Sequence, residues 1–183
     1  MSRIPVPTTT ETAPAAARPL LDGLRRQLGS VPNAFRMLAI SPAVLEGYLA
    51  LDGALRQGSI APETRERIAL AVAEINGCDY CLSARTHHAR SVTRLDDAEI
   101  TANRNGASND PQADAVVRLA ATIARTRGAV ADADLAAFKA AGYDDAQAIE
   151  VVALVALNTL TNYVNKLART DIDFPIITAR AAA

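Results

Sequence analysis

The chain contains only two cysteines, Cys78 and Cys81, and two residues separate them. Residues three apart in a helix hold their Cα atoms near the separation that a disulfide requires, so this pair can close one. If a helix begins here, its free N–H groups and positive dipole also favour a thiolate over a thiol. The spacing therefore predicts a redox-active dithiol.

The residues that follow the cysteines place other reactive side chains on the same helical face. At about 100° per residue, a sector of about 80° contains four of them: Cys78, Cys81, Arg85 and His88. His87 points to the opposite side of this helix. Because the chain has only two histidines, we expect His88 to be the one that lies beside the thiols.

Two other interpretations of the cysteine pair stay open. A zinc site would use Cys78, Cys81, His87 and His88, although one helix cannot surround a metal tetrahedrally. An inert pair is the second alternative, because free cysteine packs as a small hydrophobe. We favour the redox interpretation, since an isolated pair in a reducing compartment is more often catalytic or metal-binding than structural.

Glu66 is a candidate for proton transfer. It lies one turn before Leu70, on a face of the preceding helix that is otherwise apolar. Burial of the carboxyl would raise its pKa and suit it to proton transfer. Alternatively, Glu66 is solvated in the first turn of the helix, where the helix dipole favours an acidic residue. The spacing leaves both alternatives open.

The elements that must position these residues are helices. Half of the residues are hydrophobic, alanine is abundant, and no alternating β pattern is present. Residues 1–14 carry three prolines and are expected to form an extended arm. We expect one all-α domain over 15–183, with helices near 16–28, 33–39, 42–57, 61–76, 78–92, 96–104, 112–127, 132–141 and 144–168.

The last predicted helix carries two stripes. One is apolar throughout and comprises Ile149, Val152, Ala153, Ala156, Leu160, Val164 and Leu167. The other begins apolar and becomes rich in amides and hydroxyls at Asn158, Thr161, Asn162 and Asn165. Such a change could mark a pocket wall or a subunit contact. We favour hydrogen bonding between helices, because buried amides are normally satisfied.

Composition narrows the classes of function. Nineteen Lys and Arg against 20 Asp and Glu give a formal charge of −1, so nucleic-acid binding is not expected. Apolar runs are too short to cross a membrane, and the N-terminus has no signal-peptide core. We therefore expect a cytoplasmic protein. No glycine pattern predicts a nucleotide, flavin or haem site, so no cofactor is expected.

The assembled residues resemble a known family. Glu66, followed after eleven residues by Cys78-Asp79-Tyr80-Cys81, resembles the core motif of the AhpD-like alkylhydroperoxidases in the carboxymuconolactone decarboxylase family. Further segments resemble the longer, peroxidase-related branch, and with them the likeness covers nearly the whole chain: 31–35, 41–43, 65–66, 162–165 and 171–175.

The resemblance implies roles for individual residues. Cys81 would be the thiolate that attacks the peroxide, Cys78 the resolving thiol and Glu66 the base of a proton relay. Arg85 stands where the family usually has a relay histidine, and Tyr80 where some members place one. A guanidinium is permanently protonated and cannot shuttle a proton, so Arg85 could bind an acidic substrate or pair with Glu66. His88 could then serve the relay.

The resemblance also implies a fold, an activity and partners. It implies an AhpD-like helical bundle that assembles as a homo-oligomer, a trimer or a hexamer. The activity would be reduction of a small-molecule hydroperoxide, with an external dithiol as reductant. The alternatives are a carboxymuconolactone decarboxylase-like enzyme, which would not need two cysteines, and a catalytically weakened oligomeric protein that retains the fold.

Overall fold

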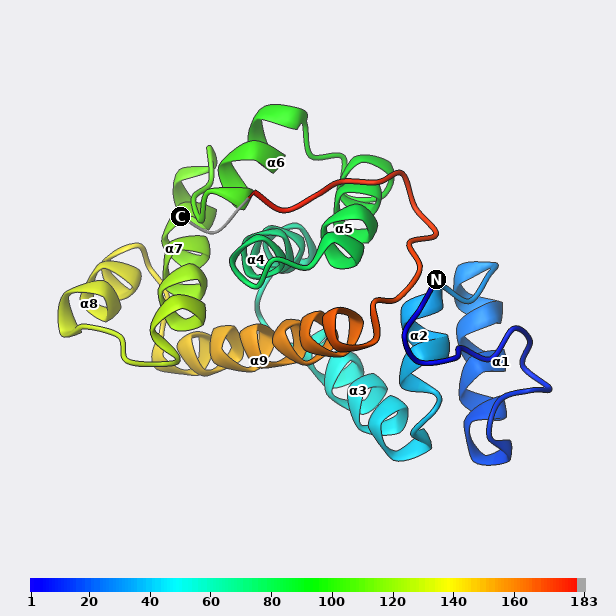
Figure 1. Cartoon of the computed structure of the whole chain (residues 1–183). Helices are drawn as coiled ribbons and strands as arrows, with labels where there is room; N and C mark the ends of the chain where they lie inside the picture. Colours follow the sequence, from blue (N-terminus) through cyan, green and yellow to red (C-terminus); the bar gives the residue numbers. More distant parts are fainter. Residues whose placement is uncertain (181–183) are drawn as a thin grey trace.

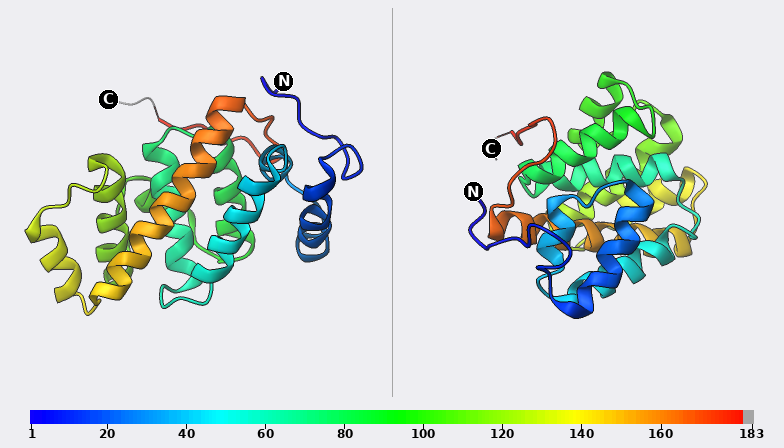
Figure 2. Two further views of the ribbon diagram at one scale, coloured as in Figure 1. Left: turned by 90° about the horizontal axis from the view of Figure 1, so that it is seen from below. Right: turned by 90° about the vertical axis from the view of Figure 1, so that its right-hand side faces the viewer.

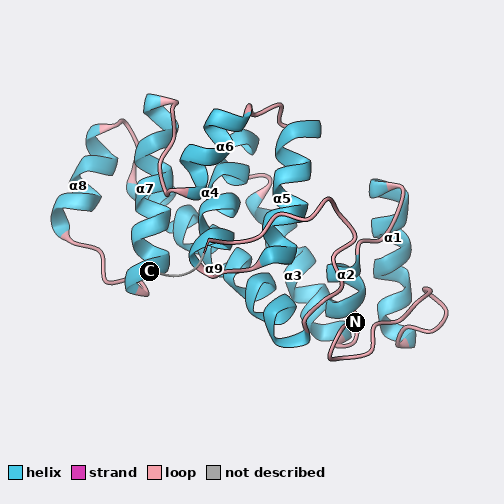
Figure 3. Cartoon of the chain, turned by 45° about the horizontal axis from the view of Figure 1, so that its top comes forward, coloured by secondary structure: helices cyan, strands magenta, loops and turns pink. Residues whose placement is uncertain are grey.

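The computed structural model describes residues 1–180, and all regular structure in this range is helical (Figure 3). A short 3-10 helix at Ala15–Ala17 precedes the α-helices, so residues 1–14 contain no helix. The α-helices are α1 (Arg18–Leu28), α2 (Asn33–Leu38), α3 (Pro42–Leu55), α4 (Pro62–Ile75), α5 (Asp79–Ser91), α6 (Asp97–Arg104), α7 (Pro111–Thr126), α8 (Asp132–Ala140) and α9 (Asp145–Ala168).

Helix α4 forms the centre of the fold, with α5, α6, α7 and α9 packed around it (Figure 1). It begins with Pro62 in its first turn, where the missing N–H of proline costs nothing. Ile68 and Val72 are fully buried on one face, and Leu70 is fully buried on another face, where it packs with Ala89 and Ile100. Intervening alanines let the neighbouring helices approach closely. A helix that is apolar around its circumference must lie inside the molecule, as the sequence indicates.

Helix α9 connects the two main parts of the core (Figure 2). Its N-terminal half packs with α4, α7 and α8 around Val116, Phe138 and Val151. Farther along the helix, Leu157 packs with α1 and α3 around Leu21 and Leu45. Asp144 and Gln147 form a capping box that fixes where α9 begins. One long helix therefore sets the position of the N-terminal helices relative to α4.

The junction between α4 and α5 positions the cysteines. Gly77 adopts a left-handed conformation with φ of 62°, which favours glycine because it has no Cβ. The Cys78 amide then donates to the Ala73 carbonyl at 3.0 Å. Cys78 occupies the N-cap position of α5 and Cys81 lies one turn into the helix. Both cysteines thus lie at a helix start, as the sequence predicts.

The apolar stripe predicted on the last helix faces outward. Five large side chains of α9, which we call the α9 outer stripe, are exposed: Ile149, Val152, Leu160, Tyr163 and Leu167. On the opposite side, Val151, Leu154 and Val155 are buried against the core. The amide-bearing row therefore faces inward and the purely apolar row faces solvent in the single chain.

The N-terminus lies beside the end of α9. The Met1 ammonium and the Asp171 carboxylate are 2.8 Å apart. From there, the C-terminal segment crosses α5 (Figure 1). It is held there by hydrogen bonds between Ser83 and Ile177 and from the Ala179 amide to the Asp79 carboxylate. No helix within residues 1–180 is long and apolar enough to cross a membrane.

Candidate functional site

The two cysteines form a disulfide, and their Cα atoms are 5.3 Å apart. Their surroundings differ. Cys78 is 1% exposed and is packed beneath the surface, whereas Cys81 is 6% exposed and borders a pocket. A reagent in this pocket would therefore meet the Cys81 sulfur first.

The pocket beside Cys81 has a volume of about 380 Å³. Aromatic side chains from four parts of the chain line it: Phe35 from α2, Tyr48 from α3, Tyr80 from α5 and Phe174 from the C-terminal segment. Polar side chains of α5 and α9 line the region that contains the sulfur. The pocket thus combines apolar walls with one polar, redox-active region.

Glu66 is buried, which settles the alternatives that its sequence position left open. The side chain is 4% exposed, and its Oε2 lies 3.3 Å from Arg85 Nη1 and 3.1 Å from His88 Nδ1. The other carboxylate oxygen, Oε1, is buried and accepts no hydrogen bond from the described residues. Glu66 on α4 is therefore bound to two basic side chains of α5.

The expected rise in the pKa of Glu66 is wrong in sign. Burial does raise the pKa of this carboxyl, but the positive charge of Arg85 and the hydrogen bond from His88 outweigh burial. The net pKa lies below the ordinary value of 4.5, so Glu66 is ionised at neutral pH. In turn, Glu66 raises the pKa of Arg85, against the effect of burial. The expectation from burial did not include the pairing with Arg85, which the sequence offered as one of two possible roles of that residue.

Both histidines border the pocket beside Cys81, although the helical wheel places them on opposite sides of α5. His88 contacts Glu66, is about half-exposed and lines the pocket. It therefore connects the buried carboxylate with the space beside Cys81. The ring of His87 instead packs against Phe174, with a centroid separation of 5.7 Å. The zinc alternative required His87 to bind the same metal as the two thiolates. The His87 ring instead packs against Phe174 of the pocket wall.

The Tyr80 hydroxyl anchors segments that close the site. It donates to Asp173 Oδ1 at 2.8 Å and accepts from the Ala34 amide at 2.9 Å. Burial raises the pKa of Tyr80, and the nearby Asp173 carboxylate raises it further. The hydroxyl therefore stays protonated at neutral pH and holds α2 and the C-terminal segment against α5.

The amide-bearing row of α9 lines the pocket and also makes interhelical hydrogen bonds. Asn162 accepts from Asn76 at 2.9 Å, which is the role that the sequence favoured. Asn158 accepts from Arg85 Nη2 at 3.4 Å. Asn165 donates to the Cys81 sulfur at 3.5 Å. Sequence reasoning noted this row but assigned none of its members to the site.

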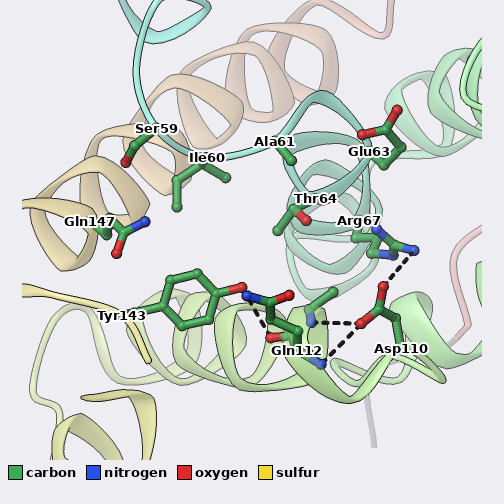
Figure 4. A pocket seen from close by; sticks show the side chains of 11 residues that line it. Ser59, Ile60, Ala61, Glu63, Thr64, Arg67, Asp110, Gln112, Tyr143 and Gln147 are labelled. Atoms are coloured by element: carbon green, nitrogen blue, oxygen red, sulfur yellow. Dashed lines mark hydrogen bonds and ion pairs between the residues drawn. The ribbon is translucent and has the colours of Figure 1, made fainter. Parts of the chain in front are cut away.

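A second pocket lies at the other end of α4 (Figure 4). It has a volume of about 360 Å³ and is lined by polar side chains including Thr64, Arg67 and Tyr143. Arg67 is paired there with Glu99 at 2.7 Å. The cysteines follow the C-terminal end of α4, whereas this pocket borders its N-terminal turns. It is therefore separate from the dithiol.

Comparison with protein families matches residues 42–122 to the carboxymuconolactone decarboxylase family. This segment contains Glu66 and both cysteines. Comparison with curated proteins gives no match.

Three solved structures share the fold over nearly the whole chain. The first is an uncharacterized peroxidase-related protein from Ralstonia eutropha JMP134 with an alkylhydroperoxidase AhpD core. It is 26% identical to this chain and has a TM-score of 0.82. The match covers 94% of this chain and 92% of that one. A peroxidase-related protein from Silicibacter sp. TM1040 is 22% identical, with a TM-score of 0.78 and coverages of 93% and 91%. The debrominase Bmp8, in complex with 2,3,4-tribromopyrrole, is 20% identical, with a TM-score of 0.77 and coverage of 94% of each chain.

Removing the Arg85 charge should make the protein less tolerant of acid. Because the folded-state pKa of Glu66 is lowered, the ion pair stabilises the protein above pH 4.5 and is lost as the pH falls through the folded-state pKa. Arg85→Met should raise that pKa, shift acid unfolding to higher pH, and lower the free energy of unfolding at pH 7 by about 2 kcal/mol. Urea unfolding across pH 3 to 8 measures both effects.

Arg56→Met is the matched control, because Arg56 forms a surface pair with Asp52 and is about half-exposed. Its loss should change the free energy of unfolding by less than about 1 kcal/mol. If the pH profiles of Arg85→Met and the natural chain superimpose, Arg85 does not hold Glu66 in its charged form.

Proposed function

We propose that this chain, which belongs to the carboxymuconolactone decarboxylase family as an AhpD-like member, is a thiol peroxidase that reduces hydroperoxides with the Cys78 and Cys81 pair. The observation that carries the proposal is the asymmetry of the pair. Only Cys81 borders the pocket, and Cys78 lies directly behind it in a disulfide. An attacking and a resolving thiol require this arrangement.

The first step is attack on the peroxide. The Cys81 thiolate attacks one oxygen of the O–O bond and becomes a sulfenic acid, and the other oxygen takes a proton and leaves as an alcohol or water. The Cys78 thiol then attacks the Cys81 sulfur, which forms the disulfide and releases water. Two electrons have passed from the dithiol to the peroxide, so an external dithiol must reduce the pair before the next cycle.

The proton relay in this proposal uses Glu66 and His88. His88 reaches both the pocket and the carboxylate, so it can carry protons between the leaving oxygen, the Cys78 thiol and Glu66. Arg85 keeps Glu66 ionised but cannot itself shuttle a proton. In this proposal, Arg85 supplies the positive charge that keeps Glu66 ionised, and His88 transfers the proton.

The outer surface supports assembly. We propose a homo-oligomer, a trimer or a hexamer, in which the α9 outer stripe packs against a second copy. Five exposed large side chains on one face of one helix form the kind of apolar patch that marks protein interfaces. We also propose a cytoplasmic location, because the reductants there would regenerate the dithiol.

Replacing either cysteine should separate the two thiol roles. Cys81→Ser should abolish dithiol-dependent consumption of cumene hydroperoxide, because no thiolate then borders the pocket. Cys78→Ser should allow one oxidation of Cys81 and block disulfide formation, so intact mass should show a sulfenic acid rather than a loss of two hydrogens.

The same assay tests the alternatives. Unchanged turnover in Cys81→Ser would contradict the peroxidase proposal. Free thiols that persist after peroxide treatment would favour the weakened scaffold, and turnover of a carboxymuconolactone without need of either cysteine would favour the decarboxylase. 2,3,4-Tribromopyrrole, the ligand of the similar debrominase, is a further probe of the same pocket.

Substitutions at His88 and Arg85 should show which of the two residues carries the proton. His88→Gln should lower peroxide turnover by about 100-fold, because general acid–base catalysis is lost. Arg85→His should bring no gain, since His88 already contacts Glu66. His87→Gln is the control and should have the smaller effect, because its ring packs on Phe174. A gain from Arg85→His without a loss from His88→Gln would show that His88 is not the relay.

Charges on the α9 outer stripe should weaken assembly. Val152→Glu combined with Leu160→Glu should shift the mass in solution toward the monomer, because carboxylates are costly to bury at an interface. Val92→Glu places the same charge at an exposed apolar site outside α9 and should leave the mass unchanged. Light scattering coupled to gel filtration measures these masses. A natural chain that is already monomeric would contradict the proposed assembly.

A further inference from the structure

We propose that Asn165 is an additional catalytic residue, whose side-chain amide donates a hydrogen bond to the Cys81 sulfur and stabilises the attacking thiolate. This inference rests on the proposed function, because it assumes that Cys81 is the thiol that attacks. It adds a residue of α9 to the proposed reacting groups, which otherwise come from α4 and α5.

The contact is direct and enclosed. Asn165 Nδ2 lies 3.5 Å from Cys81 Sγ in the disulfide form of the pair, and the Asn165 residue is 5% exposed. The partners are 84 residues apart in the chain, so the packing of α9 against α5 brings them together. A hydrogen bond to the charged form of a group favours that form, and the effect grows where water is excluded.

The capping amide at the start of helix α5 is directed to the sulfur of Cys78 and not to that of Cys81. The backbone amide of Cys81 donates to the sulfur of Cys78 at 3.2 Å, so the capping interaction favours a thiolate at Cys78. Cys81 is the third residue of the helix, and the hydrogen bond to its sulfur comes from another helix. Asn165 is the side chain that donates to it in the described part of the chain.

Charged groups near the sulfur are already bound to other partners. On α5, Arg85 and His88 bind Glu66 of α4. Asp173 of the C-terminal segment accepts from Tyr80. On α9, the Lys166 ammonium donates to the Asn76 carbonyl at 2.6 Å. These charged groups do not donate to the Cys81 sulfur, whereas Asn165 does.

The other end of the amide supports a functional role. Asn165 Oδ1 is buried and accepts no hydrogen bond from the described residues. An acceptor left unpaired in the interior costs stability, and Asn103 Oδ1 outside the site shares this feature, so what distinguishes Asn165 is its contact with the sulfur. The neighbouring Asn162 does pair its oxygen, with Asn76. Asn165 is thus costly in the fold and in contact with the reacting sulfur.

The test measures the pKa of the Cys81 thiol in a Cys78→Ser background, where no disulfide can form. The rate of alkylation by iodoacetamide is followed from pH 5 to 10. Asn165→Ala should raise this pKa by about one unit, which slows alkylation about tenfold at pH values below both pKa values. Asn165→Asp should raise it further, because a carboxylate replaces the donor with a like charge.

Asn162→Ala is the matched control, because it removes an amide of the same row that does not contact either sulfur. It should leave the pKa of the Cys81 thiol unchanged even if it lowers the melting temperature. Asn165→Asp preserves the shape of the side chain, so the test holds even if Asn165→Ala does not fold. Superimposable alkylation profiles for Asn165→Asp and the background chain would overturn the proposal.

The outcome is independent of peroxidase activity. Alkylation uses no peroxide, so a shift in the pKa without turnover would uphold the role of Asn165 in stabilising the thiolate and reject the proposed reaction. Turnover that requires Cys81, together with an unshifted pKa, would uphold the reaction and reject the role of Asn165.

Discussion

A carboxylate buried between two helices is the constraint on which the dithiol site depends. Glu66 belongs to α4, and both of its partners, Arg85 and His88, belong to α5. A buried carboxylate is several kcal/mol unfavourable unless it is paired, so α5 can rotate little about its own axis without losing this compensation. The turn at Gly77 sets where α5 begins, and the ion pair sets which face it turns toward α4. The direction of the Cys81 sulfur follows from both.

The identity of the paired cation determines how the carboxylate can act. A histidine beside Glu66 could both attract and exchange a proton, whereas Arg85 can only attract. With its pKa below the ordinary value, Glu66 is a weak base, and its main effect is to place negative charge beside His88. In the proposed peroxidase, a histidine in contact with a carboxylate is well suited to hold and release a proton. In that proposal, the relay histidine lies one helical turn beyond Arg85 along α5.

The helices and one face of the site could be predicted from the sequence, but the contacts across the site could not. The helical period of α5 places His88 on the same face as the cysteines and His87 on the opposite face. Both positions could be predicted because all of these residues belong to one helix. The sign of the Glu66 pKa shift could not be predicted, because burial and pairing with Arg85 of a second helix oppose each other and the sequence left open whether the pair forms. Asn165 was missed as a site residue for the same reason, since its partner lies 84 residues away. The row of amides on α9 was the one sequence feature that pointed to Asn165, and it was equally consistent with hydrogen bonding between packed helices.

The chemical difference between the two sulfurs also arises from tertiary packing. Two cysteines three residues apart carry the same functional group, and the start of α5 favours the charge on Cys78. Cys81 can be the attacking thiol only if other parts of the fold favour it. The pocket gives it access to substrate, and Asn165 on α9 gives it a hydrogen-bond donor. Because α9 carries the donor for Cys81, packs against α2 and α3, and bears the outer stripe on its opposite side, a partner bound to that stripe would act on the thiol and on the pocket walls through the same helix.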